Sequence, residues 1–248
     1  MFLSAINIYM TEKNSFLETL QRRHNFRYFK KEAPNKDIIQ KILQMSIDHC
    51  PIKNDIWHFS VEVYGPEYQE EKNDLCIRTV CDSKINKMPW EQQKGRYNYY
   101  LKNPKDEMFK TDDKKYNNQV IAPYLIVYRK KMWNHFGWER RLFRSDEQMK
   151  SYYPGYHGDI SLISMGIHAY CISLLANYYN IDTSFCRCFV NPKVHIGPHN
   201  KIYDDGHIEL TVGLGYEDKD LNNLIDSKKK QFRIEGKPDL DDVIKWQK

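Results

Sequence analysis

RHNFRYF, residues 23–29, places two arginines, a histidine and an asparagine among three aromatic residues. The stretch follows a helix that we expect over residues 11–23, with Thr11 as its N-cap. Phe16 and Leu20 lie at helical spacing within that segment. Because guanidinium groups carry forked donors that match phosphate oxygens, this junction between helix and loop is the first candidate for binding a phosphate-bearing ligand.

Downstream of this stretch, the sequence predicts helices and strands in an α+β pattern, with one sheet packed between helices. Residues 35–50 carry isoleucine and leucine at helical spacing and end before Pro51. Alternating apolar residues predict a half-buried strand at 57–65, and a continuous apolar run predicts a central strand at 120–130. We expect a long, largely buried helix at 158–182, capped by Asp159, and a last strand at 208–217.

The whole chain, residues 1–248, is predicted to form a single domain. Residues 65–118 are polar and rich in lysine and aromatic residues, with no clean periodicity. Their apolar content is too low for an independent core, so we interpret them as an irregular excursion from the main domain. Residues 217–248 are interpreted as a C-terminal tail.

The charge pattern argues against a general nucleic-acid-binding protein. The chain carries 38 Lys and Arg against 33 Asp and Glu, and the two signs alternate along most of its length. A nucleic-acid-binding protein usually concentrates its positive charge in one stripe. Here the only dense basic runs are RYFKK, residues 27–31, and KKKQFR, residues 228–233.

The cysteines predict a reducing, cytoplasmic location without disulfides, since none of the six belongs to a CxxC pair and no signal segment opens the chain. No apolar run is long enough to span a bilayer. Cys186 and Cys188, with the histidines that follow at 195, 199 and 207, do not have the spacing of a closed zinc site, and we predict no bound metal.

Five segments, in order along the chain, resemble segments of the nitroreductase family. The sequence as a whole resembles a divergent member of that family. RHNFRYF resembles the family's basic N-terminal motif, and CPIKNDIWHFSVEVYG, residues 50–65, resembles the segment that leads into its first strand. APYLIVY (122–128) and TVGLGYE (211–217) resemble two family strands, and the stretch from KKKQFR to the C-terminal Trp246 resembles the family's basic close.

The resemblance implies a homodimer with a mostly antiparallel sheet and FMN bound in pockets at the subunit interface. It further implies that NADH or NADPH reduces the flavin, which then reduces a small organic acceptor of nitroaromatic or quinone type by ping-pong hydride transfer. By position, the resemblance implies that Arg23, His24 and Asn25 contact the phosphate and ribityl chain of FMN and that Arg27 lies near the flavin N1 and O2 edge. It implies that the loop of Pro51, Ile52, Lys53 and Asn54 reaches the flavin from the partner subunit. Lys230 and Arg233 match the family's second phosphate-binding group.

Three departures from the family pattern leave alternative functions open. Asn25 replaces a serine, and Ile52 and Lys53 stand where the family has small hydroxyl residues. In FCRCF, residues 185–189, Arg187 stands where glycines pass the flavin, so it either blocks that face or binds an anionic substrate. The alternatives are a non-catalytic flavin-binding protein and a flavin-cleaving or dehalogenating enzyme. Taken singly, the residues also have ordinary interpretations, such as an arginine that compensates a helix dipole or an asparagine in a turn.

Overall fold

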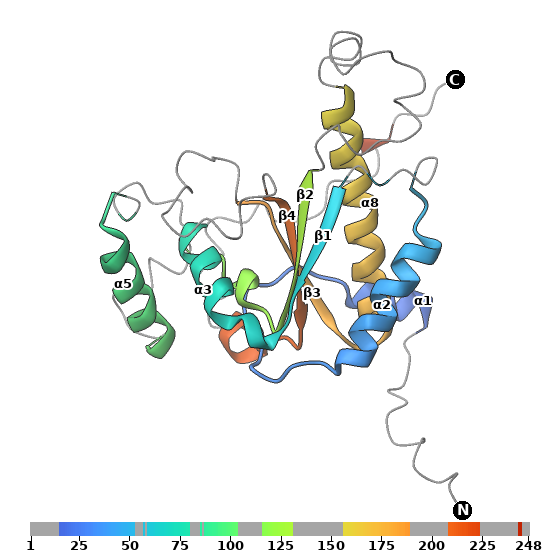
Figure 1. The fold of residues 1–248 in the computed structure, drawn as a ribbon. Coiled ribbons are helices and arrows are strands. Elements are labelled where there is room, and N and C mark those ends of the chain that lie inside the picture. Colours follow the sequence, from blue (N-terminus) through green and yellow to red (C-terminus); the bar gives the residue numbers. More distant parts are fainter. Residues whose placement is uncertain are drawn as a thin grey trace, which may run out of the picture.

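The computed structural model describes residues 15–52, 57, 59–79, 85, 87–103, 116–130, 156–188, 208–223 and 243–244. Within these residues the chain forms an α+β fold with one four-stranded sheet. The strands are β1 (Phe59–Tyr64), β2 (Tyr124–Lys130), β3 (Asp182–Cys186) and β4 (Ile208–Gly215), in the spatial order β1-β2-β4-β3. Every neighbouring pair is antiparallel, as Figure 1 shows.

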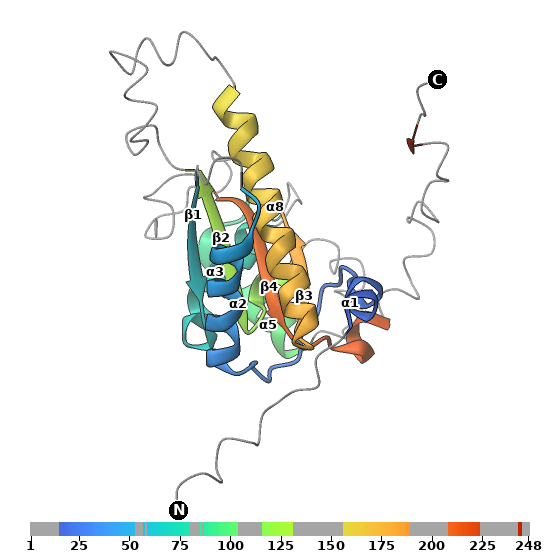
Figure 2. The ribbon, with the colours of Figure 1, turned by 90° about the vertical axis from the view of Figure 1, so that its right-hand side faces the viewer.

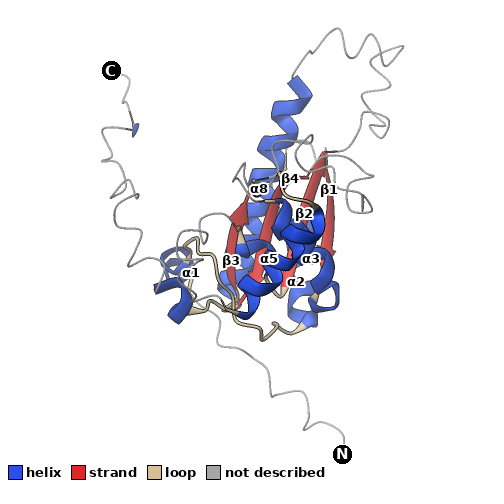
Figure 3. Cartoon of the chain, turned by 90° about the vertical axis from the view of Figure 1, so that its left-hand side faces the viewer, coloured by secondary structure: helices blue, strands red, loops and turns tan. Residues whose placement is uncertain are grey.

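Helices cover both faces of the sheet. Figure 2 shows α2 (Lys36–His49) and α8 (Tyr156–Tyr178) on one face, whereas Figure 3 shows α3 (Gln69–Arg78) and α5 (Trp90–Lys102) on the other. The short helix α1 (Phe16–Arg22) lies beside the β3 edge (Figure 2). Short 3-10 helices at Pro66–Tyr68 and Asn118–Ile121 precede α3 and β2. None of the described helices is long and apolar enough to cross a membrane.

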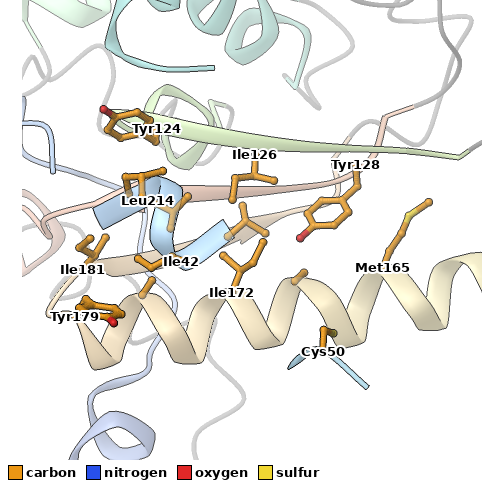
Figure 4. Close-up of a cluster of buried hydrophobic side chains, with 14 of the residues drawn as sticks. Ile42, Cys50, Tyr124, Ile126, Tyr128, Met165, Ile172, Tyr179, Ile181 and Leu214 are labelled. Carbon is orange, nitrogen blue, oxygen red and sulfur yellow. The ribbon is translucent and has the colours of Figure 1, made fainter. Parts of the chain in front are cut away.

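The central strand β2 explains why two cores form. Side chains alternate along a strand, so Ile126 and Tyr128 face α2 and α8, whereas Leu125 and Val127 face α3 and α5. All four are fully buried. In Figure 4, Ile126 and Tyr128 point from the sheet toward Ile172 of α8. The sequence prediction of a central strand covered on both faces is therefore confirmed, although β2 begins at Tyr124 rather than at residue 120.

The segment 65–118 contains the helices α3 and α5 among its described residues, and this corrects the expectation of an irregular excursion. Helices α3 and α5 build the second core from Leu75, Ile77, Tyr97 and Tyr100. The polar composition concealed this core because many of the buried side chains are tyrosines or, in Lys72 and Arg78, carry a charge. Lys72 is fully buried, and its Nζ donates to the backbone carbonyls that precede β2, at residues 122 and 123.

The long helix and the strand after it also differ from the expectation. Helix α8 ends at Tyr178 rather than at residue 182, because Asn180 adopts a left-handed conformation with φ 61° that stops the helix. The chain then forms β3, which the sequence analysis did not predict. Asp159 lies inside the first turns of α8 and is not its cap. Ser15, not Thr11, caps α1, where it forms a capping box with Glu18.

Candidate functional site

The basic stretch found in the sequence is fixed in place by residues 216–222. The backbone N–H of Lys30 donates to the carbonyl of Tyr216 at 2.7 Å, and the N–H of Asp218 donates to the carbonyl of Tyr28 at 3.0 Å. Asn222 is buried, and its Oδ1 accepts from the backbone N–H of Arg27 at 3.0 Å. Because its Nδ2 also donates to the Tyr28 carbonyl, one amide fixes the path of the stretch.

An ion pair anchors the start of the stretch to β3. Arg22 donates from Nε and Nη2 to Oδ1 of Asp182, at 3.1 and 2.8 Å. The same guanidinium donates to the side chain and the carbonyl of Asn180. Asp182 accepts a further bond at Oδ2, from the backbone N–H of Glu217 at 2.8 Å. This carboxylate therefore joins α1, β3 and the segment after β4.

Asn25 joins the basic stretch to the end of β3. Its Oδ1 accepts from the Ser184 hydroxyl at 2.8 Å and from the Phe185 backbone N–H at 2.9 Å. The Ser184 hydroxyl also contacts the carbonyl of Phe26. The contact brings together parts of two segments that the sequence predicted separately, RHNFRYF (residues 23–29) and FCRCF (residues 185–189), the latter described to residue 188.

Arg23 and His24 differ in what their donors contact. The Arg23 guanidinium lies 5.8 Å from the centre of the Tyr170 ring on α8 and is partly exposed. Within the described part of the chain, no hydrogen bond to this guanidinium is present. His24 has its Nδ1 2.9 Å from the carbonyl of Arg22 and its Nε2 3.3 Å from the carboxylate of Glu217. His24 is thus directed to protein acceptors, whereas Arg23 faces the solvent side of α8.

Arg27 and the Cys188 thiol interact electrostatically at this site. Cys186 lies at the end of β3, and a hydrogen bond from its thiol is the largest cause that lowers the pKa of Cys188. Burial opposes this effect, whereas the positive charge of Arg27, the backbone N–H of Arg187 and the Asn117 side chain add to it, and together these causes bring the pKa to about 6. The Arg187 side chain itself is exposed. The sequence predicted Cys188 only as part of FCRCF and as a rejected zinc ligand, and it gave no signal for Asn117, which only the folded structure brings next to residues 186–188.

The other predicted residues are not joined to this cluster. Pro51 is exposed, whereas the Ile52 side chain is buried in the core beside α2 and α8, and the Ile52 N–H donates to the carbonyl of Cys50 at 2.8 Å. No hydrogen bond between described residues links either of them to residues 23–27. Lys53, Asn54, Lys230 and Arg233 lie outside the described residues.

A second feature, a cavity of about 400 Å³ beside α2, β1 and α8, was not found from the sequence. Its polar wall includes His168, which is 2% exposed. The Ser46 hydroxyl donates to the carbonyl of Leu43, so it accepts from His168 Nε2 at 3.0 Å. His168 Nδ1 then accepts from the Tyr128 hydroxyl at 2.9 Å. This network satisfies the neutral ring, and burial lowers the pKa of His168 to about 4.

The donor set of the first site fits an anionic ligand. Arg23, Arg27 and Arg187 supply guanidinium groups on two segments that Asn25 holds together, while the carboxylates of Asp182 and Glu217 are paired with Arg22 and His24. Such a set suits an anionic group such as a phosphate. Among the described residues, no group of three or more His, Cys, Asp or Glu is arranged to hold a metal ion.

Comparison with known proteins identifies solved structures that share this fold. No protein-family model matches the chain, and no curated protein matches it in sequence. Solved structures do match it. A point mutant of an FMN- and NADPH-dependent nitroreductase from Sphigopyxis has a TM-score of 0.56 and 14% identity, over 94% of this chain and 99% of that one.

Two further structures give the same result. The FMN-dependent nitroreductase from Mycobacterium smegmatis, solved with NADPH, has a TM-score of 0.56 and 12% identity, over 94% and 97% of the two chains. A nitroreductase family protein from Streptococcus pneumoniae has a TM-score of 0.55 and 15% identity, over 94% and 100%. The chain therefore has the nitroreductase fold over nearly its full length, and the resemblance seen in the sequence is confirmed for the fold.

Proposed function

We propose that the protein is an FMN-dependent oxidoreductase that uses NADH or NADPH to reduce a small organic acceptor of nitroaromatic or quinone type. The observation that carries the proposal is the junction made by Asn25, which holds the basic stretch against residues 185–188 in a chain with the nitroreductase fold. Bound FMN would supply the hydride chemistry. The chain's own residues would bind and orient it.

The roles follow from charge and exposure. Arg23, with its partly exposed guanidinium, would bind the phosphate, together with Lys230 and Arg233 of the basic C-terminal run. Arg27 would stabilise negative charge that develops on the ring, since its charge already acts on a thiol at the same site. Asn25 and His24 would position the backbone of the stretch, because their side chains bond to the protein. Arg187, which is exposed, would meet the incoming acceptor.

Loss of Arg23 should weaken FMN binding specifically. We expect Arg23→Ala to raise the Kd for FMN by about 10- to 150-fold, the equivalent of about 1.5–3 kcal/mol for a charge-assisted hydrogen bond. Titration of the apoprotein with FMN, followed by flavin fluorescence, measures the change. The matched control is Lys31→Ala, which removes a nearby exposed charge and should change the Kd less than about twofold. Equal affinities for Arg23→Ala and wild type would refute the phosphate role.

We also infer that two copies associate through α8, so that each FMN would lie at the subunit interface. Ile163, Ile167 and Tyr170 lie on one face of this helix and are 61%, 38% and 44% exposed. An apolar stripe of this kind requires cover from another surface. The stripe ends at Tyr170, and the Arg23 guanidinium lies over the Tyr170 ring. The proposed phosphate contact would therefore lie beside the interface.

The double variant Ile163→Glu/Ile167→Glu should therefore dissociate the dimer. Two carboxylates per chain, facing their symmetry copies, should raise the dimer dissociation constant on the order of 100-fold. Sedimentation equilibrium measures the mass. The control is Leu101→Glu on α5, on the opposite side of the sheet, which should remain dimeric. A wild-type chain that sediments as a monomer at micromolar concentration would contradict this arrangement.

A further inference from the structure

Two cysteines at the end of β3 are suited to a reaction that the proposed flavin chemistry does not require. Cys186 is the last residue of β3, and Cys188 follows two positions later. Residues two apart in an extended chain project to the same side, and their Cα atoms are at most about 7 Å apart. This upper bound lies just above the range of about 4.4–6.8 Å usual for a disulfide, so a small backbone movement is enough to close the bond. Cys188 packs against the buried cluster to which Cys186 belongs, so the two thiols lie on the same side of the chain.

The two cysteines differ in exposure and in the direction of their pKa shifts. Cys186 is 3% exposed, and its pKa is raised by the hydrogen bond to Cys188, by burial and by the negative charge of the neighbouring thiolate. Cys188 is only partly buried, and it is stabilised as a thiolate by Cys186, by Arg27 and by the Arg187 backbone. An accessible thiolate beside a buried protonated thiol is the arrangement of an attacking and a resolving cysteine.

We propose that Cys186 and Cys188 form a redox-active dithiol, a modification site for small-molecule disulfides, at which Cys188 attacks and Cys186 resolves. With oxidised glutathione as the oxidant, the Cys188 thiolate attacks one sulfur, forms a mixed disulfide and releases one glutathione thiolate. Cys186 then loses its proton and attacks the Cys188 sulfur, releasing the second glutathione. The net reaction converts one protein dithiol and one glutathione disulfide into one protein disulfide and two glutathione thiols.

The chain contains its own control pair. Cys50 and Cys171 also pack in one core cluster, between the end of α2 and α8, but burial raises the pKa of Cys50 to about 12 and raises that of Cys171 as well. Burial raises the pKa of Cys76 to about 12. These three should stay reduced under conditions that oxidise the pair at 186 and 188.

The decisive experiment uses the full-length protein without flavin, so that its outcome does not depend on the proposed function. The protein is incubated with oxidised glutathione at pH 7, alkylated and digested with chymotrypsin, which cuts after Phe185 and Phe189. We expect the peptide Cys186–Phe189 to become lighter by two hydrogen atoms and to lose both alkylation sites. Cys50 and Cys171 should remain fully alkylated. A peptide that stays dialkylated would overturn the proposal.

A second measurement tests the division of roles. The rate of Cys188 alkylation by iodoacetamide should rise with a midpoint near pH 6, and at that pH it should exceed the rate in an unfolded peptide of the same sequence by about tenfold. Cys186→Ser should move the midpoint upward and leave Cys188 as a stable mixed disulfide with glutathione. A wild-type midpoint at or above that of the peptide would refute Cys188 as the attacking thiol.

Discussion

Asp182→Ala should lower the free energy of unfolding by about 3 kcal/mol. Asp182 is 8% exposed and accepts bonds from Arg22 and from the Glu217 backbone. Breaking a buried ion pair costs about 3–5 kcal/mol. The lower end applies because 34% of the Arg22 side chain remains exposed and can be hydrated.

Urea unfolding at one fixed protein concentration measures this loss. The matched control is Asp74→Ala, which breaks the pair with Lys94 at 3.8 Å on the partly exposed surface of α3 and α5. That variant should lose less than about 1 kcal/mol. If Asp182→Ala unfolds within a few tenths of a kcal/mol of wild type, the carboxylate does not join α1, β3 and the segment after β4 as described.

The second large effect is a loss of stability at mildly acidic pH that His168 causes. Its pKa is about 4 in the folded chain, compared with 6.5 for an unperturbed histidine. Between these values the unfolded chain binds a proton that the folded chain does not, so stability falls as the pH falls from 6.5 to 4. The shift corresponds to about 3 kcal/mol at about pH 4, and the contribution is constant above about pH 6.5.

Comparison with His168→Gln isolates this contribution from that of the carboxylates. A glutamine can donate to Ser46 and accept from Tyr128 without titrating. The other groups packed on His168, Trp57 and Phe59 among them, carry no charge in this range. We expect the variant to lose about 3 kcal/mol less than wild type between about pH 7 and about pH 4 in urea unfolding. Identical losses in the two proteins would show that His168 is not held neutral.

Much of the fold was predictable because its elements carry local patterns. Helix α2 has an asparagine cap at residue 35 and a regular apolar face, and the predicted helix agrees with it closely. Strand β2 is apolar on both faces because helices cover both. Strand β3 was missed because no Gly or Pro separates it from the apolar helix α8. The turn between them depends instead on one asparagine, Asn180, in the left-handed conformation. Helix α3 was missed because buried Lys72 and Arg78 appear polar in the sequence.

The candidate site was predictable only in part, for a different reason. The basic stretch is contiguous, so its donors are visible in the sequence, but the partners of Asn25 lie about 160 residues away. No local pattern shows that its side chain bonds to Ser184 and Phe185 rather than to a ligand. The pKa of Cys188 is lowered by Cys186, which is near in sequence, but also by Arg27 and Asn117, which only the tertiary fold brings near.

Anaerobic spectroscopy of the full-length protein with FMN tests the central proposal most directly. The protein is loaded with FMN, freed of unbound flavin and mixed with NADPH or NADH. We predict one FMN retained per chain and loss of its yellow absorbance with at least one of the two nicotinamides, followed by recovery when a quinone is added. Failure to retain FMN would contradict the proposal, and retained flavin that stays oxidised with both nicotinamides would reduce the protein to a flavin-binding module.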